Sequence, residues 1–176
     1  CVASEEILYP EISRSLALRG AEVLLHSSSE VSSPRLTPKD IAKRARAHEN
    51  NCWLISANSA GILDVDMPTG SVDGLSKVVD YLGEVRAEAG SGESMAAQAN
   101  IDIGALRRYR ARPGMGNMLA RQRLELFAAT YAGTVYPANT MLDPQGQVRQ
   151  PERAHFAQVQ RSTMASLLSR GVIASE

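Results

Sequence analysis

The sequence has few of the residues that build metal centres, disulfide frameworks and membrane spans. It contains two cysteines and three histidines in 176 residues. Cys1 and Cys52 are too few for a disulfide framework, and His26, His48 and His155 lie far apart without metal-ligand spacing. No apolar run approaches the roughly 20 residues that cross a bilayer. We therefore expect no metal site and no membrane partner.

An excess of charge of either sign is also missing. Lys plus Arg and Asp plus Glu both number 19, so the formal net charge is zero. A nucleic-acid binder normally carries a basic footprint, and we expect no nucleic-acid partner. The apolar share of 44% and the charged share of 22% are typical of an ordinary globular domain. With so little cysteine, a reducing, cytoplasmic location is the default expectation.

The pattern of apolar residues predicts an α/β fold. Strands are expected over 22–26, 52–57 and 98–103, with a hairpin formed by 77–82 and 84–88. Helices are expected over 10–19, 37–50, 105–112, 117–131 and 152–170, and polar loops over 27–36 and 58–74. Cys1-Val2-Ala3 is interpreted as the end of a buried strand. Helices alternating with strands, followed by a hairpin, are typical of α/β architecture.

Five motifs carry a resemblance to a known family. Ser4-Glu5-Glu6-Ile7-Leu8-Tyr9-Pro10-Glu11 is similar to the pattern C-Y-D/E-x-x-F-P-E, and Arg14, Leu16-Ala17 and Gly20-Ala21 follow it as R-x-L-A and G-A do. Residues 44–50 resemble an R-A-x-x-E-N helix, Asn58 to Gly61 an N-x-x-G turn, and residues 74–83 a G-x-S-x-I-V-D-x-x-G hairpin. In this order they resemble the nitrilase–amidase, or carbon–nitrogen hydrolase, superfamily.

The resemblance implies a fold and a chemistry. The fold would be part of a four-layer α-β-β-α sandwich, with 1–176 forming a single, N-terminally incomplete domain. Residues 1–112 would be the recognisable core, and 113–176 a variable helical tail. The family uses a cysteine nucleophile, a glutamate base and a lysine that stabilises the tetrahedral intermediate. The last two precede the cysteine in the family, so we expect the sequence to be a fragment.

Ser4 occupies the position of the nucleophilic cysteine, and three interpretations stay open. It is an altered nucleophile, which needs stronger base activation than a thiol, or a relic in a binding or scaffold module. Alternatively, the register is shifted and Cys1 is the nucleophile. Cys1 has two further interpretations, a small buried hydrophobe or an N-terminal nucleophile that uses its own α-amine as base.

Three other residues are candidates for the site. Glu5 would lend its backbone N–H to an oxyanion. Asn58 closes a predicted buried strand, where its amide would orient a substrate carbonyl or tie down the loop to Gly61. His26 is either a substrate-binding or acid–base group at the same rim, or a surface histidine at a strand end.

The function expected from the resemblance is hydrolysis of a small amide, carbamoyl or nitrile substrate through an acyl-enzyme, a mechanism that implies no cofactor. The alternative is a catalytically silent paralogue that binds a ligand or a partner chain. We also expect a homo-oligomer. The last predicted helix carries an apolar stripe that would be buried either against a second subunit or against its own domain; it consists of Phe156, Val159, Met164, Leu167 and Leu168.

Overall fold

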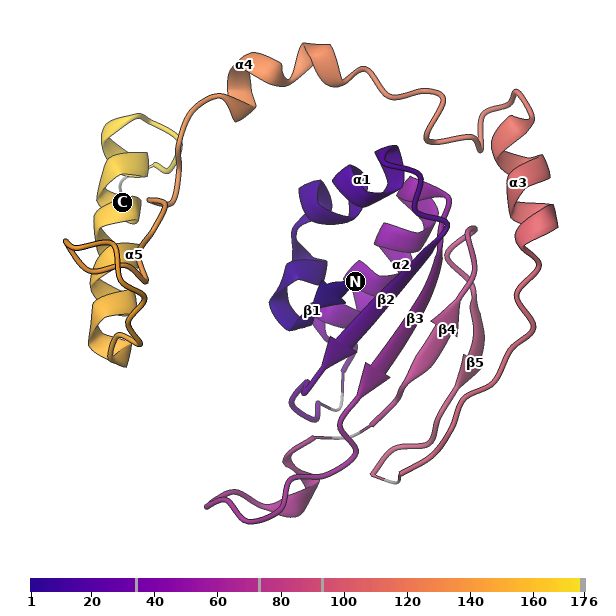
Figure 1. The fold of residues 1–176 in the computed structure, drawn as a ribbon, viewed down its shortest axis with the longest axis horizontal. Coiled ribbons are helices and arrows are strands. Elements are labelled where there is room, and N and C mark those ends of the chain that lie inside the picture. The colour runs from indigo at the N-terminus through magenta and orange to yellow at the C-terminus, as the bar shows by residue number, and fades with distance from the viewer. Residues whose placement is uncertain (34, 73, 93, 175–176) are drawn as a thin grey trace. The chain divides into compact units, whose positions relative to one another are not determined.

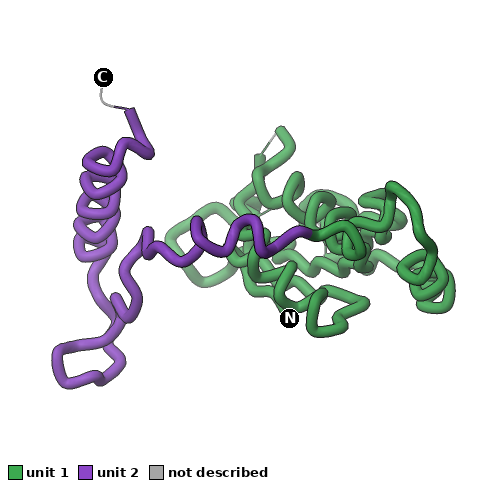
Figure 2. Tube along the Cα trace, turned by 90° about the horizontal axis from the view of Figure 1, so that it is seen from above, with its two compact units in different colours: residues 1–122 green, residues 123–176 purple. Residues whose placement is uncertain are grey.

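A computed structural model describes residues 1–33, 35–72, 74–92 and 94–174. The chain divides into two compact units, residues 1–122 and residues 123–176 (Figure 2).

The first unit is built on a mixed five-stranded sheet (Figure 1). Its strands lie in chain order, β1-β2-β3-β4-β5. β1, β2 and β3 are parallel, whereas β4 and β5 are added antiparallel as a hairpin. The predicted α/β class is therefore confirmed. The strands are β1 (Val2–Ala3), β2 (Val23–Ser28), β3 (Trp53–Asn58), β4 (Lys77–Val79) and β5 (Val85–Glu88).

Helices α1 (Pro10–Leu18) and α2 (Pro38–Asn50) cover one face of this sheet (Figure 1). Both begin with proline, whose missing N–H costs nothing in the first turn. The Thr37 side chain caps α2 by accepting a hydrogen bond from the Asp40 N–H at 3.2 Å. Between helices and sheet lies the main apolar core: Val2, Ile7, Ala17, Leu24, Ala42, Ala47, Cys52, Leu54 and Val79.

The turn of the β4–β5 hairpin packs closely on α2. Gly83 there has a φ of +85°, and a Cβ at this position would lie 3.1 Å from the backbone oxygen of Arg44. The Arg44 Nε donates to the Gly83 carbonyl at 3.0 Å. Only glycine combines this backbone conformation with so close an approach.

The strand predicted over 98–103 is wrong, and the structure gives the reason. These residues are extended but pair with no strand, and α3 (Ile103–Ala111) begins at their end. Ala99, Ile101 and Ile103 pack against a second core cluster on the sheet. The alternation of apolar residues thus reflects packing on the face of the sheet, without a hydrogen-bonded ladder. That cluster contains Trp53, Val78 and Leu106.

The long helix predicted over 117–131 is also wrong. Asn117 does cap a turn, accepting from the Ala120 N–H at 3.1 Å, but only η3 (Leu124–Leu126) and α4 (Ala128–Tyr131) follow. Asn51, at the end of α2, accepts from the Met118 N–H at 2.8 Å and so holds the turn in place. Residues 123–131 are all exposed, and short helices without packing are marginal in water.

The second unit ends in α5 (Arg153–Ser169), close to the predicted range of 152–170. Residues 132–152 are irregular, with one bridge between Leu142 and Val148. None of residues 123–174 is buried. Within the described residues, no helix combines the length and hydropathy that crossing a bilayer requires.

Candidate functional site

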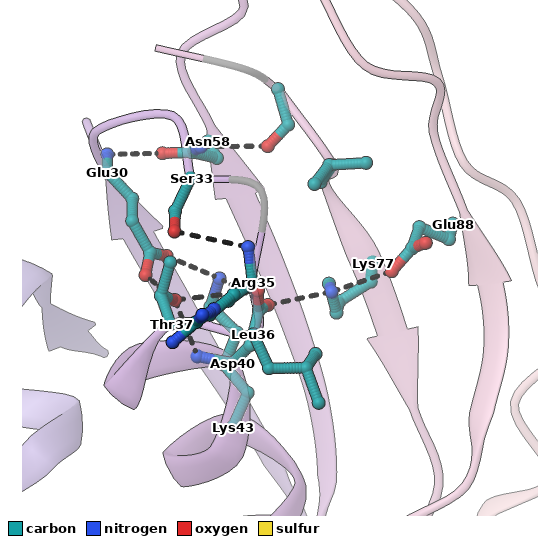
Figure 3. A pocket seen from close by; sticks show the side chains of 12 residues that line it. Glu30, Ser33, Arg35, Leu36, Thr37, Asp40, Lys43, Asn58, Lys77 and Glu88 are labelled. Carbon is teal, nitrogen blue, oxygen red and sulfur yellow. Dashed lines mark hydrogen bonds and ion pairs between the residues drawn. The ribbon is translucent and has the colours of Figure 1, made fainter.

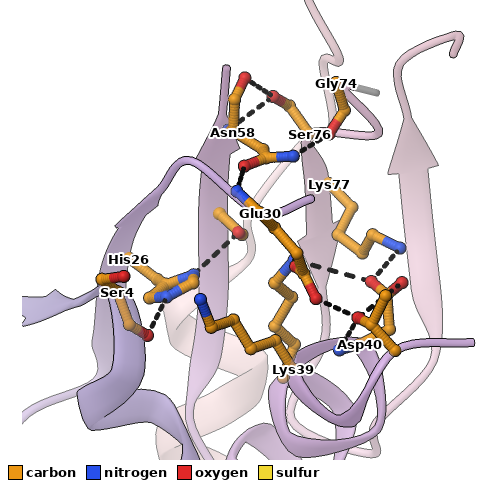
Figure 4. A network of polar contacts seen from close by, with 12 residues as sticks. Ser4, His26, Glu30, Lys39, Asp40, Asn58, Gly74, Ser76 and Lys77 are labelled. Atoms are coloured by element: carbon orange, nitrogen blue, oxygen red, sulfur yellow. Dashed lines mark hydrogen bonds and ion pairs between the residues drawn. The ribbon is translucent and has the colours of Figure 1, made fainter. Parts of the chain in front are cut away.

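Ser4 lies at the edge of the sheet where three parallel strands end. It directly follows β1, while β2 ends at Ser28 and β3 at Asn58. In α/β folds this edge is where binding and catalytic groups gather. The parallel register thus brings the sequence-predicted residues Ser4, His26 and Asn58 to one end of the sheet (Figure 4).

Ser4 occupies a sharp strand-to-helix turn. Its φ of +41° is unusual for a residue with a side chain, and the structure that holds it must offset the strain. The 3-10 helix η1 (Ser4–Leu8) begins at once, whereas the sequence predicted no helix before about Pro10. The Ala3 N–H donates to Glu6 Oε2 at 2.7 Å and closes the turn. A strained turn of this kind exposes a nucleophile.

Arg46 of α2 holds the far end of the same turn. Its guanidinium donates from Nε to the Ile7 carbonyl at 3.0 Å and from Nη2 to the Leu8 carbonyl at 3.1 Å. A third bond, of 2.8 Å, joins Nη1 to Glu49. Within the motif over 44–50, Arg46 therefore anchors the Ser4 turn to α2, and Glu49 pairs with the Arg46 guanidinium.

His26 is not the surface histidine that the sequence favoured. It is only 3% exposed, because β2 continues to Ser28 and its alternation turns His26 toward the helices. Its Nε2 lies 3.1 Å from the Ser4 carbonyl oxygen and its Nδ1 lies 2.9 Å from Ser56 Oγ (Figure 4). Burial lowers the pKa of His26, the Ser4 hydrogen bond opposes this, and the charges of Lys43 and Lys39 add to the lowering.

The residues on either side of Ser4 differ in their surroundings. Cys1 is exposed, so its interpretation as a small buried hydrophobe is wrong; only Val2 of β1 is buried. The Glu5 side chain points to solvent and pairs with Lys39 of α2 at 2.7 Å. The backbone N–H of Glu5 stays the predicted oxyanion donor.

The Asn58 amide joins two loops. Its Oδ1 accepts from the Glu30 N–H at 2.7 Å, and its Nδ2 donates to the Gly74 carbonyl at 2.8 Å. These contacts agree with the interpretation that Asn58 ties down a loop. Its hydrogen-bond partners, however, are Glu30 and Gly74, whereas the sequence suggested the loop to Gly61. A contact between Asn58 and a substrate stays a prediction.

A cluster of charged side chains, all buried except Glu88, was not found from the sequence. Lys43 Nζ lies 3.1 Å from Glu30 and 3.5 Å from Asp40, and Lys77 Nζ lies 2.7 Å from Asp40 and 2.6 Å from Glu88. The cluster borders a pocket of about 160 Å³ (Figure 3). Asp40, Lys43 and Ala47 follow helical spacing, so charge on the inner face of α2 was the available signal.

The charges in this cluster shift one another's pKa values. Burial alone would raise the pKa of Asp40, but the hydrogen bond from Lys77 and the charges of Lys43 and Lys77 lower it overall. Burial alone would lower the pKa of Lys77, but the hydrogen bonds from Lys77 to Asp40 and Glu88 raise it overall. The cluster is thus internally paired. Across the described ranges, no group of three or more His, Cys, Asp or Glu residues could hold a metal ion.

Comparison with known proteins identifies the class. The carbon-nitrogen hydrolase family matches residues 3–111, and the chain belongs to this family, within the nitrilase superfamily. A carbon-nitrogen hydrolase from Helicobacter pylori is similar at 26% identity and a TM-score of 0.60, over 73% of this chain and 47% of that one.

Two further structures are similar. The NitFhit protein of C. elegans matches at 27% identity and a TM-score of 0.60, over 70% of this chain and 28% of that one. The NitN amidase from Nesterenkonia matches at 25% identity and a TM-score of 0.53, over 73% and 43%. The chain therefore spans less than half the length of each of these relatives.

Proposed function

We propose that this chain carries the nucleophile portion of a hydrolase that acts on carbon–nitrogen bonds other than peptide bonds. The substrate would be a small amide, carbamoyl or nitrile compound, with Ser4 as the acylated residue. The observation that carries this proposal is the strained turn at Ser4, which stands at the carboxyl edge of the parallel strands in a member of the family. One relative supports it: a variant of the Nesterenkonia amidase holds the acetamide moiety of fluoroacetamide covalently at its active-site cysteine.

The remaining catalytic groups would come from the rest of a full-length domain. The family's glutamate base and lysine precede its nucleophile, and the second sheet of the four-layer sandwich would pack on the face opposite α1 and α2. Leu25 on that face is 49% exposed, and Ala3, Ser27 and Ala57 beside it are also exposed. Such an apolar area suits burial by a second sheet.

A silent binding module is the second candidate, and one observation favours it. A serine hydroxyl needs strong base activation, yet the Nε2 of the nearby His26 donates to a carbonyl and is therefore not a base toward Ser4. A Ser4 without an active base would leave a fold that binds its ligand without turnover.

Ammonia release from small amides and nitriles distinguishes the two candidates in a full-length protein. We expect turnover that Ser4→Ala removes and Ser4→Cys retains or raises, since a thiol is the better nucleophile. Turnover unaffected by Ser4→Ala would overturn the assignment of the nucleophile. No turnover in either the wild type or Ser4→Cys would support the binding module.

The register can be tested separately in the full-length protein, in which the groups that would activate position 4 are also present. In a Cys1→Ser background, Ser4→Cys should react with fluoroacetamide about tenfold faster than a matched cysteine at the exposed position Ser29. Mass spectrometry of the modified peptides gives both rates. Equal rates would show that position 4 has no special reactivity. In Ser4→Cys with Cys1 restored, labelling of Cys1 while position 4 stays unmodified would move the nucleophile to Cys1.

A further inference from the structure

We propose that His26 is a positioning residue, which sets the direction of the oxyanion-binding N–H of Glu5 by holding the carbonyl of the same peptide group. The inference rests on the proposed function, because it takes Ser4 as the acylated residue and the Glu5 N–H as the oxyanion donor. In this role His26 acts through the Ser4–Glu5 peptide group and takes no part in the reaction itself.

The hydrogen bonds fix the tautomer of His26. A carbonyl oxygen only accepts, so the Nε2 that lies 3.1 Å from the Ser4 oxygen must carry the ring proton. In the neutral ring Nδ1 is then the acceptor, and the Ser56 hydroxyl at 2.9 Å donates to it. Ser56 is only 2% exposed and His26 3%, so water does not compete for these bonds.

The surroundings keep His26 neutral. Burial and the ammonium groups of Lys43 and Lys39 lower its pKa, while the Ser4 carbonyl and the Glu30 carboxylate work in the opposite direction with smaller overall effect. The sheet register places Val2, His26 and Ser56 side by side on the face that α1 and α2 cover. The hydrogen bonds from Ser56 to His26 and from His26 to the Ser4 carbonyl therefore lie on the covered face of the sheet, away from solvent.

The geometry of the peptide group links this hydrogen bond to the direction of the Glu5 N–H. The carbonyl of Ser4 and the N–H of Glu5 belong to one planar trans peptide, in which the two groups point in opposite directions. Holding the carbonyl toward His26 therefore turns the Glu5 N–H away from the covered face. Ser4 needs such a restraint, because its φ of +41° is a strained conformation that the chain would otherwise leave.

Two reactions of a thiol at position 4 test the idea in the Ser4→Cys, Cys1→Ser chain. Acylation by p-nitrophenyl acetate forms a bond from Sγ to the acyl carbon through a tetrahedral oxyanion; nitrophenolate leaves and the thiol proton passes to buffer. Alkylation by iodoacetamide displaces iodide from a saturated carbon and forms no oxyanion. Loss of an oxyanion donor costs about 10²-fold or more in acyl transfer, so a misdirected donor should slow acylation alone.

Three variants separate positioning from packing. His26→Leu, which removes the donor, should slow acylation at least about tenfold and change alkylation by less than about twofold. His26→Gln, which keeps an N–H donor of similar reach, should restore most of the acylation rate. Ser56→Ala, which leaves Nδ1 without its donor, should give an intermediate loss. Equal slowing of both reactions by His26→Leu, or of neither, would overturn the proposal.

Nuclear magnetic resonance of the wild-type chain tests the inference without any variant. The ¹⁵N shifts of His26 should show a protonated Nε2 and a bare Nδ1 at about pH 8, where a histidine of ordinary or lowered pKa is neutral, and a ring protonated at Nδ1 alone would overturn the inference. The residual dipolar coupling of the Glu5 N–H should change in His26→Leu and return in His26→Gln. Failure of the proposed function would appear separately, as ammonia release from the full-length protein that Ser4→Ala leaves unchanged, whereas these couplings still decide the role of His26.

Discussion

Asp40 lies between two buried ammonium groups, and its removal should be costly. Its carboxylate faces Lys77 at 2.7 Å and Lys43 at 3.5 Å, and all three side chains are almost fully buried. Without the Asp40 charge, Lys43 would keep Glu30 and Lys77 would keep only Glu88, which is 41% exposed, so the cluster would hold an excess of buried positive charge. Removing one member of a buried charge group costs about 3 kcal/mol. We expect Asp40→Asn to lower the free energy of unfolding by about that amount in urea titrations. The matched control is Glu84→Gln. Glu84 pairs with Arg86 at the surface, so losing this ion pair should leave the free energy of unfolding nearly unchanged.

The same residue predicts a pH dependence. The pKa of Asp40 is lowered in the folded chain, so its contribution is present above the unfolded pKa and is lost as the pH falls through the folded value. The wild type should therefore lose stability below about pH 4, and Asp40→Asn should show a flatter curve there. An identical acid limb in both proteins would show that Asp40 does not contribute.

Individual residues show what sequence alone could predict. Ser4 and Asn58 were found because motifs and strand ends mark them, and both lie at the predicted edge of the sheet. The surroundings of His26 were not found, because its burial depends on β2 running two residues farther and on its neighbours across the sheet. The partners in the charge cluster were hidden for the same reason: Glu30, which pairs with Lys43, and Lys77, which pairs with Asp40, come from outside α2.

At the scale of elements, Arg46 connects α2 to the turn that carries Ser4. Its two bonds to the Ile7 and Leu8 carbonyls need the planar fork of a guanidinium. Arg46→Lys should therefore cost about 2 kcal/mol of stability and should speed amide hydrogen exchange in residues 4–8 more than in β3. Arg108→Lys, at an exposed ion pair, is the control and should change neither. Faster exchange in both variants would contradict the specific link.

Elements also show where local patterns fail. Alternation over 98–103 was interpreted as a strand, although it arises from Ala99, Ile101 and Ile103 resting on the sheet. The cap at Asn117 was real, but residues 123–131 are all exposed, so no packed face stabilises a long helix there. Both errors concern whether a segment packs on parts of the chain distant in sequence, which periodicity does not record.

At the scale of the whole chain, residues 123–174 of the second unit lack a core that would stabilise their long helix. None of residues 123–174 is buried, and α5 contains no buried side chain. A 17-residue helix gains most of its stability from burying an apolar face, and this unit offers it no core. The exposed apolar residues of α5 include Met164 at 54% and Leu168 at 42%. A surface of this kind needs a partner, and we predict that the partner is a second copy of the chain.

Charge placed on the stripe should test this assembly. We expect Met164→Glu with Leu167→Glu to lower the mass seen in light scattering, because two carboxylates would have to be buried in the contact. The circular dichroism spectrum should stay nearly native, since glutamate is a good helix former. Gln158→Glu with Gln160→Glu adds the same charge at two exposed positions of α5 outside the stripe, and should leave the mass unchanged. Unfolding of the first double variant without any monomer would place the stripe in an intramolecular core, and an unchanged mass would remove α5 from the interface.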